Sequence, residues 1–262
     1  MKFAVLTIFP EMFDSFRAYG IIKKAIAENY ISVSTVNIRD FAEGRHKTTD
    51  DRPFGGGCGM VMKPEPLAKA IRKAKDLIPD SRTILLSPQG KVFDQKSAQE
   101  FAESEGLIFV CGRYEGIDER ISGDFIDEEI SLGDYVLTGG ELGAMVVIEA
   151  VTRLIPGVLG SADSAMQDSF SGSLLDFGHY TRPRDFEGSK VPDVLISGNH
   201  KDIEKYRLEA SMIRTFLKRP DLLEKRDFSK REIEILKSWC RDIEKIIETQ
   251  SLRGSGTLSG NQ

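Results

Sequence analysis

The residues best suited to hold a small molecule lie in three short segments that each contain glycine and each include or follow an apolar run. They are LLSPQG at 85–90, CGRYEGIDER at 111–120 and SLGDYVLTGGELGAM at 131–145. In the last segment Gly133, Gly139 and Gly140 lack a Cβ, so the backbone can turn sharply and approach a ligand closely. Each segment alone could be an ordinary strand-to-helix turn. Together, at the carboxyl ends of strands in an open α/β sheet, they predict one ligand pocket.

The sequence motifs of several common enzyme classes are absent. The chain has no G-x-G-x-x-G after a strand, no G-x-x-x-x-G-K-[ST], no H-E-x-x-H and no G-x-S-x-G. Dehydrogenase, kinase, zinc-protease and hydrolase functions therefore lose support. The three histidines, His46, His179 and His200, are not spaced as metal ligands, and we expect no zinc.

Composition and charge are those of an ordinary globular protein. The chain is 40% hydrophobic and 29% charged, with a net charge of −5 that argues against indiscriminate coating of nucleic acid. The first 160 residues carry 19 basic and 24 acidic side chains and the remainder 17 of each, so the excess negative charge lies in the first part. No apolar run reaches the roughly 20 residues of a membrane span, and the first residues lack a signal-peptide pattern. We expect no membrane, a cytoplasmic location, and reduced thiols at Cys58, Cys111 and Cys240.

The elements that must position the three segments alternate between strand and helix patterns. Strands are predicted over 3–8, 31–38, 83–87, 107–111 and 124–130, and helices over 11–29, 66–78, 95–105, 115–121 and 141–155. This alternation predicts an α/β fold with a mainly parallel sheet. The segments at 111–120 and 131–145 then follow strands directly.

Periodicity is lost after residue 155, where the sequence becomes small and polar. We predict a domain over 1–160, a flexible linker over 161–174, a small mainly helical domain over 175–250 and a disordered tail over 251–262. In the last helix Ser229 and Glu232 form an S-x-x-E capping box. The apolar residues that follow at helical spacing predict a core-facing stripe, made up of Ile233, Leu236, Cys240, Ile243 and Ile247.

Further segments, in order along the chain, resemble one known family. Besides the three segments above, they are TIFPEMF at 7–13, RPFGGGCGMVMKPEP at 52–66, QDSFSG at 167–172, HYTRPRDFEG at 179–188 and VPDVLISGNH at 191–200. In these the chain is similar to the bacterial tRNA (guanine-N1)-methyltransferases, the TrmD family of the SPOUT superfamily. The resemblance implies a homodimer, a trefoil knot in the parallel-sheet domain and S-adenosylmethionine as methyl donor. It also implies a tRNA-binding role for the helical domain.

The family's functional positions carry over residue by residue. Those that contact the donor correspond to Leu85, Leu86, Ser87, Gly112, Tyr114, Glu115, Leu132, Gly133, Tyr135, Leu137, Gly139 and Gly140. The general base corresponds to Asp168 and the residue that stabilises charge at guanine O6 to Arg153. Leu85 and Leu132 depart from common variants of the family but keep an apolar wall. Magnesium is associated with the family's activity, yet no carboxylate cluster marks a site, so its position stays unknown.

The resemblance also implies the substrate, which is tRNA with guanine directly 3′ of the anticodon, at position 37. Its methylation at N1 supports maintenance of the reading frame. A loop guanine is a suitable target because the N1 edge is hidden in a paired helix. Candidate phosphate contacts are the basic residues Arg182, Arg184, Lys190, Lys201, Lys218, Arg219, Lys225, Arg226, Lys230 and Arg231, although many of these could simply be solvated.

Two alternatives stay open on the sequence alone. One is a methyltransferase with the same donor pocket that acts on a ribose 2′-hydroxyl, and the other is an RNA-binding module without activity. Without the resemblance, Asp168 would be read as a solvated turn residue and Arg153 as a charge that favours a helix C-terminus. The pairing of Arg153 with Asp168 favours a base nitrogen as the methyl acceptor.

Overall fold

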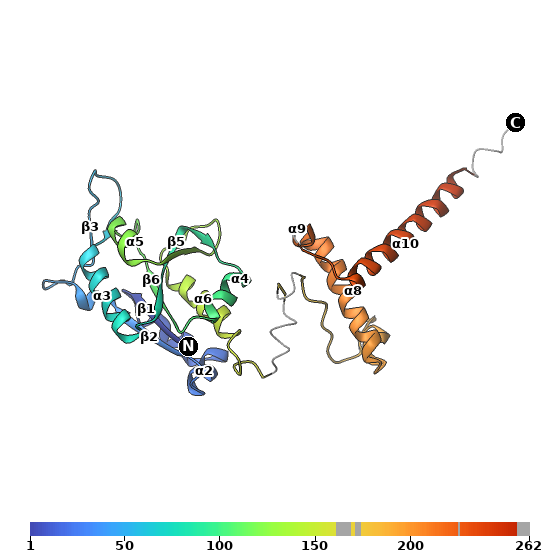
Figure 1. Ribbon diagram of the computed structural model, residues 1–262, viewed down its shortest axis with the longest axis horizontal. Helices are drawn as coiled ribbons and strands as arrows, with labels where there is room; N and C mark the ends of the chain where they lie inside the picture. Colours follow the sequence, from blue (N-terminus) through green and yellow to red (C-terminus); the bar gives the residue numbers. More distant parts are fainter. Residues whose placement is uncertain (161–168, 171–173, 225, 256–262) are drawn as a thin grey trace. The chain divides into compact units, whose positions relative to one another are not determined.

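The protein is described from a computed structural model that covers residues 1–160, 169–170, 174–224 and 226–255, with side chains to residue 249. The chain divides into two compact units, unit 1 (Met1–Met166) and unit 2 (Gln167–Gln262). Each unit has its own elements, many of which Figure 1 labels along the chain.

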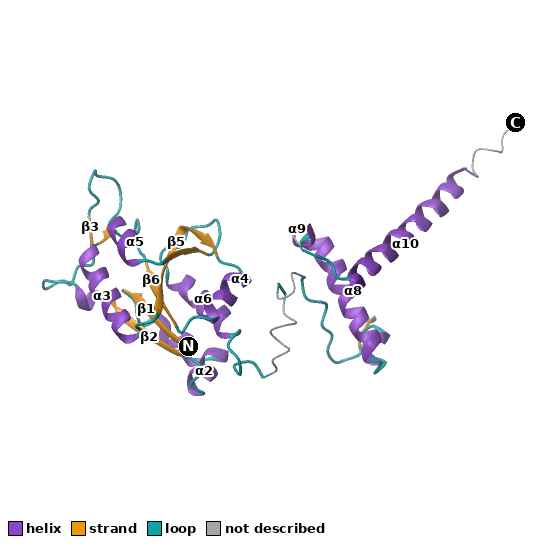
Figure 2. Ribbon diagram, viewed as in Figure 1, coloured by secondary structure: helices purple, strands orange, loops and turns teal. Residues whose placement is uncertain are grey.

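A five-stranded parallel sheet forms the centre of unit 1 (Figure 2). Its strands follow the order β2 (Ser32–Asn37), β1 (Lys2–Thr7), β6 (Gly106–Cys111), β5 (Ser81–Val92) and β7 (Glu128–Ser131), and every pairing is parallel. This confirms the predicted α/β class with a parallel sheet. The carboxyl ends of β6, β5 and β7 are neighbours, although the three strands are far apart in sequence.

Helices cover both faces of this sheet, as a parallel sheet requires. One face packs against α1 (Met12–Ala18), α2 (Gly20–Ala27), α4 (Gln95–Ala102) and α6 (Glu141–Thr152), and the other against α3 (Pro64–Leu77) and α5 (Glu119–Phe125). The strand β6, with sequence GLIFVC, is buried along its whole length. Its Phe109 joins the first apolar cluster, while Ile108 and Val110 join the second, because side chains alternate between faces. Unit 1 also contains η1 (Ile38–Phe41) and a short antiparallel pair, β3 (Asp50–Asp51) and β4 (Val61–Met62).

The single helix predicted over 11–29 is wrong, because the chain forms α1 and α2 with a break between them. Tyr19 is extended, with φ −134° and ψ 163°. Gly20 has a φ of 62°, a left-handed value that glycine adopts without strain. The apolar periodicity continues across the break and gave no sign of it.

Two predicted boundaries near the pocket also needed correction. The strand predicted over 124–130 begins only at Glu128, and the helix predicted over 115–121 begins at Glu119 and continues to Phe125. The carboxylate of Asp118 caps α5 by accepting the backbone N–H of Arg120 at 3.1 Å. The segment at 85–90 lies inside β5 rather than after it, where the register against β7 shifts between Leu86 and Lys91.

Unit 2 is mainly helical, as predicted. It contains the hairpin of β8 (Asp185–Phe186) and β9 (Ser189–Lys190), then η2 (Asp193–Ile196), α8 (His200–Lys218), α9 (Pro220–Glu224) and α10 (Lys230–Ser255). Within the described parts of both units, no helix has the length and apolar character that crossing a membrane requires.

The start of α10 confirms the predicted capping box. The Ser229 N–H donates to the Glu232 carboxylate at 2.7 Å, and the Glu232 N–H donates to the Ser229 hydroxyl at 3.3 Å. The core-facing stripe is wrong for this unit, since Ile243 and Ile247 are more than half exposed. Among the apolar residues of α10 whose side chains the structure describes, Ile235 is buried, and it lies outside the predicted stripe.

Candidate functional site

A cavity of about 380 Å³ lies where β5, β6 and β7 meet the start of α6. The three glycine-containing segments converge on it, as predicted. Of the residues predicted to contact a cofactor, those that line it are Leu85, Leu86, Ser87, Gly112, Tyr114, Glu115, Leu132, Tyr135, Leu137, Gly139 and Gly140. Gly133 is not among the lining residues, and with a φ of 145° it serves the turn beside them.

The close packing around the cavity depends on Gly140. A Cβ at this position would lie 2.8 Å from the Cα of Cys111 and 3.0 Å from the Cβ of Leu86. The Gly140 N–H instead donates to the carbonyl of Gly112 at 3.1 Å. The absence of a side chain therefore lets the start of α6 pack directly against the ends of β5 and β6.

Tyr114 and Glu115 form the wall on the side of the glycine-rich segment at 55–59. Tyr114 has a φ of 60°, which is uncommon for a non-glycine residue and marks a constrained turn. The Glu115 N–H donates to the carbonyl of Met60 at 3.0 Å, and its side chain packs against Gly59, where a Cβ would collide with the carboxylate. This wall thus holds one carboxylate in a fixed place.

The charged lining of the cavity is predominantly acidic. Glu119 and Glu129 line it together with Glu115, and the basic residue among the lining side chains is Arg113. Sequence reasoning did not single out Glu119, Glu129 or Arg113 for the cavity. Glu119 and Arg113 lie within the segment at 111–120. Glu129 lies within a predicted strand, and its place at the cavity depends on which strands become neighbours in the sheet.

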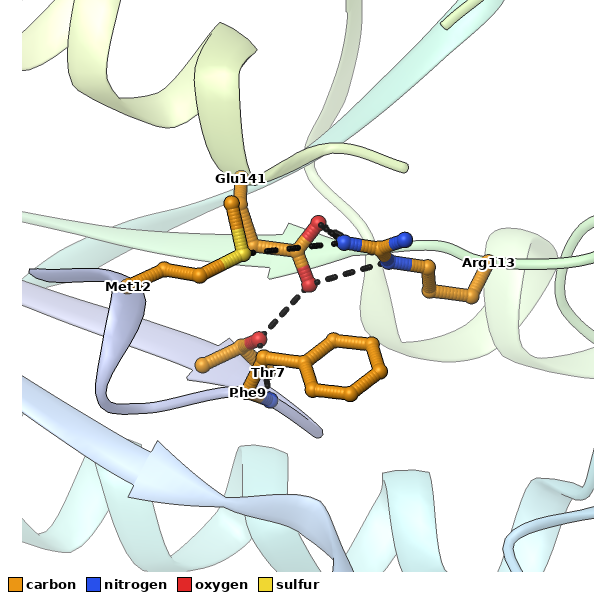
Figure 3. A network of polar contacts seen from close by, with 5 residues as sticks. All are labelled: Thr7, Phe9, Met12, Arg113 and Glu141. Carbon is orange, nitrogen blue, oxygen red and sulfur yellow. Dashed lines mark hydrogen bonds and ion pairs between the residues drawn. The ribbon is translucent and has the colours of Figure 1, made fainter. Parts of the chain in front are cut away.

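Arg113 turns its guanidinium toward a buried carboxylate (Figure 3). Glu141, at the first position of α6, is 1% exposed, and Arg113 donates to it from Nε at 3.1 Å and lies 3.0 Å away through Nη2. The Thr7 hydroxyl at the end of β1 donates to the same carboxylate at 2.7 Å. The guanidinium also stacks on Phe9, with 4.6 Å between Cζ and the ring centroid. The positive charge of Arg113 is therefore already compensated.

Cys111, beside this network, is not a nucleophile. Burial, and next to it the negative charge of Glu141, raise the pKa of its thiol well above the ordinary value. The thiol stays protonated at neutral pH. It packs in the core cluster of the first sheet face.

Arg153, one of the two residues predicted to be catalytic, is not among the residues that line this cavity. Arg153 is exposed at the C-terminal end of α6, ten residues after Gly143, which lines the cavity, so about 15 Å of helix separates the two at 1.5 Å per residue. Asp168 lies outside the described residues.

Most of the predicted phosphate contacts lie on the surface of unit 2, and one does not. Arg182, Arg184, Lys190, Lys201, Lys218, Arg219, Lys230 and Arg231 are exposed, and Lys225 lies outside the described residues. Arg226 is wrong as a phosphate contact, because its side chain is only 15% exposed and pairs with Glu232 at 2.8 Å. Among the described residues no group of three or more His, Cys, Asp or Glu side chains could hold a metal ion.

Comparison with known proteins gives a consistent result along the chain. A family described as tRNA (Guanine-1)-methyltransferase TrmD matches residues 1–225. A protein of Desulfatibacillum aliphaticivorans is 56% identical over 262 residues, which is all of both chains. A Syntrophotalea carbinolica protein is 53% identical over 92% of this chain and 97% of its own, and a Listeria innocua protein 51% identical over 91% and 98%. All three carry the name tRNA (guanine-N(1)-)-methyltransferase.

Proposed function

The chain belongs to the tRNA (guanine-1)-methyltransferase family, and we propose that it methylates N1 of guanine 37, directly 3′ of the anticodon of tRNA. The methyl donor is S-adenosylmethionine, and the cavity of unit 1 is its site. The observation that carries this proposal is the convergence of eleven predicted donor contacts on one cavity. Such a modification supports maintenance of the reading frame, and a tRNA substrate implies a cytoplasmic location.

The lining of the cavity suits this donor. Leu85, Leu86, Leu132 and Leu137 offer apolar surface for the adenosine, and glycines 139 and 140 offer backbone at close range. The carboxylates of Glu115, Glu119 and Glu129 favour a cationic ligand over an anionic one. When bound, the donor supplies an electrophilic methyl group on a sulfonium and leaves as a neutral thioether.

The chain's own part in the reaction is to position the guanine and remove its N1 proton. Asp168 takes that proton as general base, and Arg153 stabilises the negative charge that develops on O6. Because a free aspartate has a pKa of about 3.9, the surroundings of the bound guanine must raise it. Asp168→Ala should therefore lower methyl transfer about 10²- to 10⁴-fold at saturating donor, with donor affinity unchanged. Near-normal turnover would exclude Asp168 as the base.

The distance of Arg153 from the cavity of its own chain supports a site built by a homodimer. Leu142 and Val146 are about half exposed and share one face of α6 with Arg153, at spacings of four and seven residues. If two copies pack these faces antiparallel about a two-fold axis, Arg153 of each copy reaches the start of its partner's α6. One copy then holds the donor while the other acts on the base.

Two further features of this proposal follow from the family. Unit 1 carries a trefoil knot of the SPOUT type, which is compatible with the sheet order β2-β1-β6-β5-β7. Unit 2 contacts the tRNA backbone through its exposed basic side chains. Magnesium has no cluster of ligands among the described residues, so no step is assigned to it.

The proposal is tested by methyl transfer from labelled S-adenosylmethionine to two anticodon-loop transcripts, one with guanine 3′ of the anticodon and one with adenine. We expect labelling of the guanine transcript only, with the methyl on the base in digested RNA. A methyl on a ribose would support the 2′-hydroxyl alternative. Labelling of neither transcript, with donor binding intact, would contradict the proposed substrate.

A further inference from the structure

The ion pair of Arg113 and Glu141 is a feature that the proposed reaction does not use. Arg113 lines the cavity, whereas Glu141 does not. The carboxylate of Glu141 instead lies behind the cavity wall, held by the Thr7 hydroxyl on one side and the guanidinium on the other (Figure 3). Glu141 therefore touches no ligand in the cavity, and it can act on one only by compensating Arg113 or through the field of its own charge.

The charge of Arg113 is of the wrong sign for the proposed ligand. S-adenosylmethionine has a sulfonium and an ammonium against one carboxylate, so its net charge is +1, while the product S-adenosylhomocysteine is neutral overall. An uncompensated guanidinium in the cavity wall would repel the first and not the second. The side chain of Arg113 is only 18% exposed, so solvent would screen that repulsion incompletely.

We propose that Glu141 is a positioning residue that neutralises Arg113 and holds it against Phe9, so that the cavity keeps its preference for a cationic ligand. Arg113 also closes the cavity wall, because it forms a β-bridge to Gly139. The neutral pair thus joins the loops after β6 and β7 without placing a net positive charge beside the donor. This inference rests on the proposed donor.

The test compares the affinities of two ligands by calorimetry on the full-length protein. In Glu141→Gln, binding of S-adenosylmethionine should weaken about tenfold more than binding of S-adenosylhomocysteine, as expected for a like charge within 10 Å at an effective dielectric constant of 20. In Arg113→Gln the negative charge of Glu141 is left uncompensated. The ratio of the two affinities should then shift in favour of S-adenosylmethionine by a similar factor. The double variant Arg113→Gln/Glu141→Gln should restore the original ratio.

A merely structural role predicts a different pattern. Equal weakening of both ligands in either single variant would overturn the proposal, and either variant is sufficient if the other does not fold. Glu232→Gln is the matched control, since it changes another buried, arginine-paired glutamate, in unit 2, and should leave both affinities unchanged. If the unmodified protein binds neither ligand, the proposed donor itself is wrong, which is a distinct result.

Discussion

Among the described residues, a buried glutamate at the start of a helix pairs with a largely buried arginine in each unit, and the two pairs have different consequences. Glu141 at the start of α6 is paired with Arg113, and Glu232 at the start of α10 is paired with Arg226. Glu232 caps its own helix by accepting the Ser229 N–H. Glu141 caps nothing and instead accepts from the end of β1 and the loop after β6. The pair of Glu232 and Arg226 stabilises one helix terminus, whereas the pair of Glu141 and Arg113 joins three segments around a cavity.

This difference shows that ionic chemistry alone does not identify a functional site. Buried pairs contribute little net stability compared with apolar residues of similar shape, but the loss of one partner is costly. What distinguishes Arg113 and Glu141 is that one partner also lines a cavity whose other charged residues are acidic. This is why we propose a role in ligand binding for the pair of Arg113 and Glu141.

The largest expected effect is on stability. Each variant should destabilise the unit that contains its ion pair and not the other unit. Glu141→Ala and Glu232→Ala should each lower the free energy of unfolding of their own unit by about 3 kcal/mol, because each leaves a largely buried guanidinium uncompensated. The single tryptophan, Trp239, lies in α10. Its fluorescence during denaturant unfolding should therefore change with Glu232→Ala and not with Glu141→Ala, while circular dichroism reports both. A tryptophan transition shifted equally by both variants would refute the separation.

A smaller effect is expected from closing the cavity without changing any charge. Gly140→Val introduces atoms against Cys111 and Leu86, and the resulting displacement of α6 should lower methyl transfer about 100-fold. Gly123→Ala in α5 is the control, because a Cβ there meets nothing within 4 Å. Steady-state kinetics with both variants would check this. Comparable losses in the two variants would mean that the cavity geometry is not responsible.

The smallest expected effect is a pH dependence of the stability of unit 2 that comes from Glu232. Burial opposes ionisation of Glu232, but hydrogen bonds from Ser229 and the charge of Arg226 outweigh it and lower its pKa below the ordinary 4.5. The stabilisation is therefore fully present above about pH 4.5 and is lost as the pH falls through the folded-state pKa. Unfolding followed by the fluorescence of Trp239 should show this loss of stability at low pH. The loss should be smaller in Glu232→Gln. An unchanged pH profile in that variant would assign the effect to other groups.

Much of unit 1 could be predicted from the sequence because its signals are local. Apolar runs marked the strands, and glycines at their ends marked the cavity, so that all the predicted donor contacts except Gly133 line it. The break at Tyr19 was missed because the apolar period continues across it. Glu129 and the partnership of Arg113 with Glu141 were missed because they depend on which strands become neighbours, and the sheet order does not follow the sequence.

Unit 2 was predicted less completely, for a related reason. Its capping box depends on two residues three apart and was found from the sequence, whereas the exposure of Ile243 and Ile247 depends on what packs beside α10. Helical periodicity identifies the residues that share one face of a helix, but it does not identify the element that packs against that face. The same limit applies to Arg226, whose burial against Glu232 could not be read from its charge.

The central claim is that the cavity of one copy acts with Arg153 of its partner, and mixing two inactive variants tests it most directly. Gly140→Val removes a working cavity and Arg153→Ala removes the charge stabiliser, so each variant alone should be nearly inactive. After subunit exchange at equal amounts, half of the dimers contain one intact composite site, and methyl transfer should return to about a quarter of the unmodified level. If the cavity and Arg153 of the same chain acted together, the mixture would stay inactive, and that result would contradict the account.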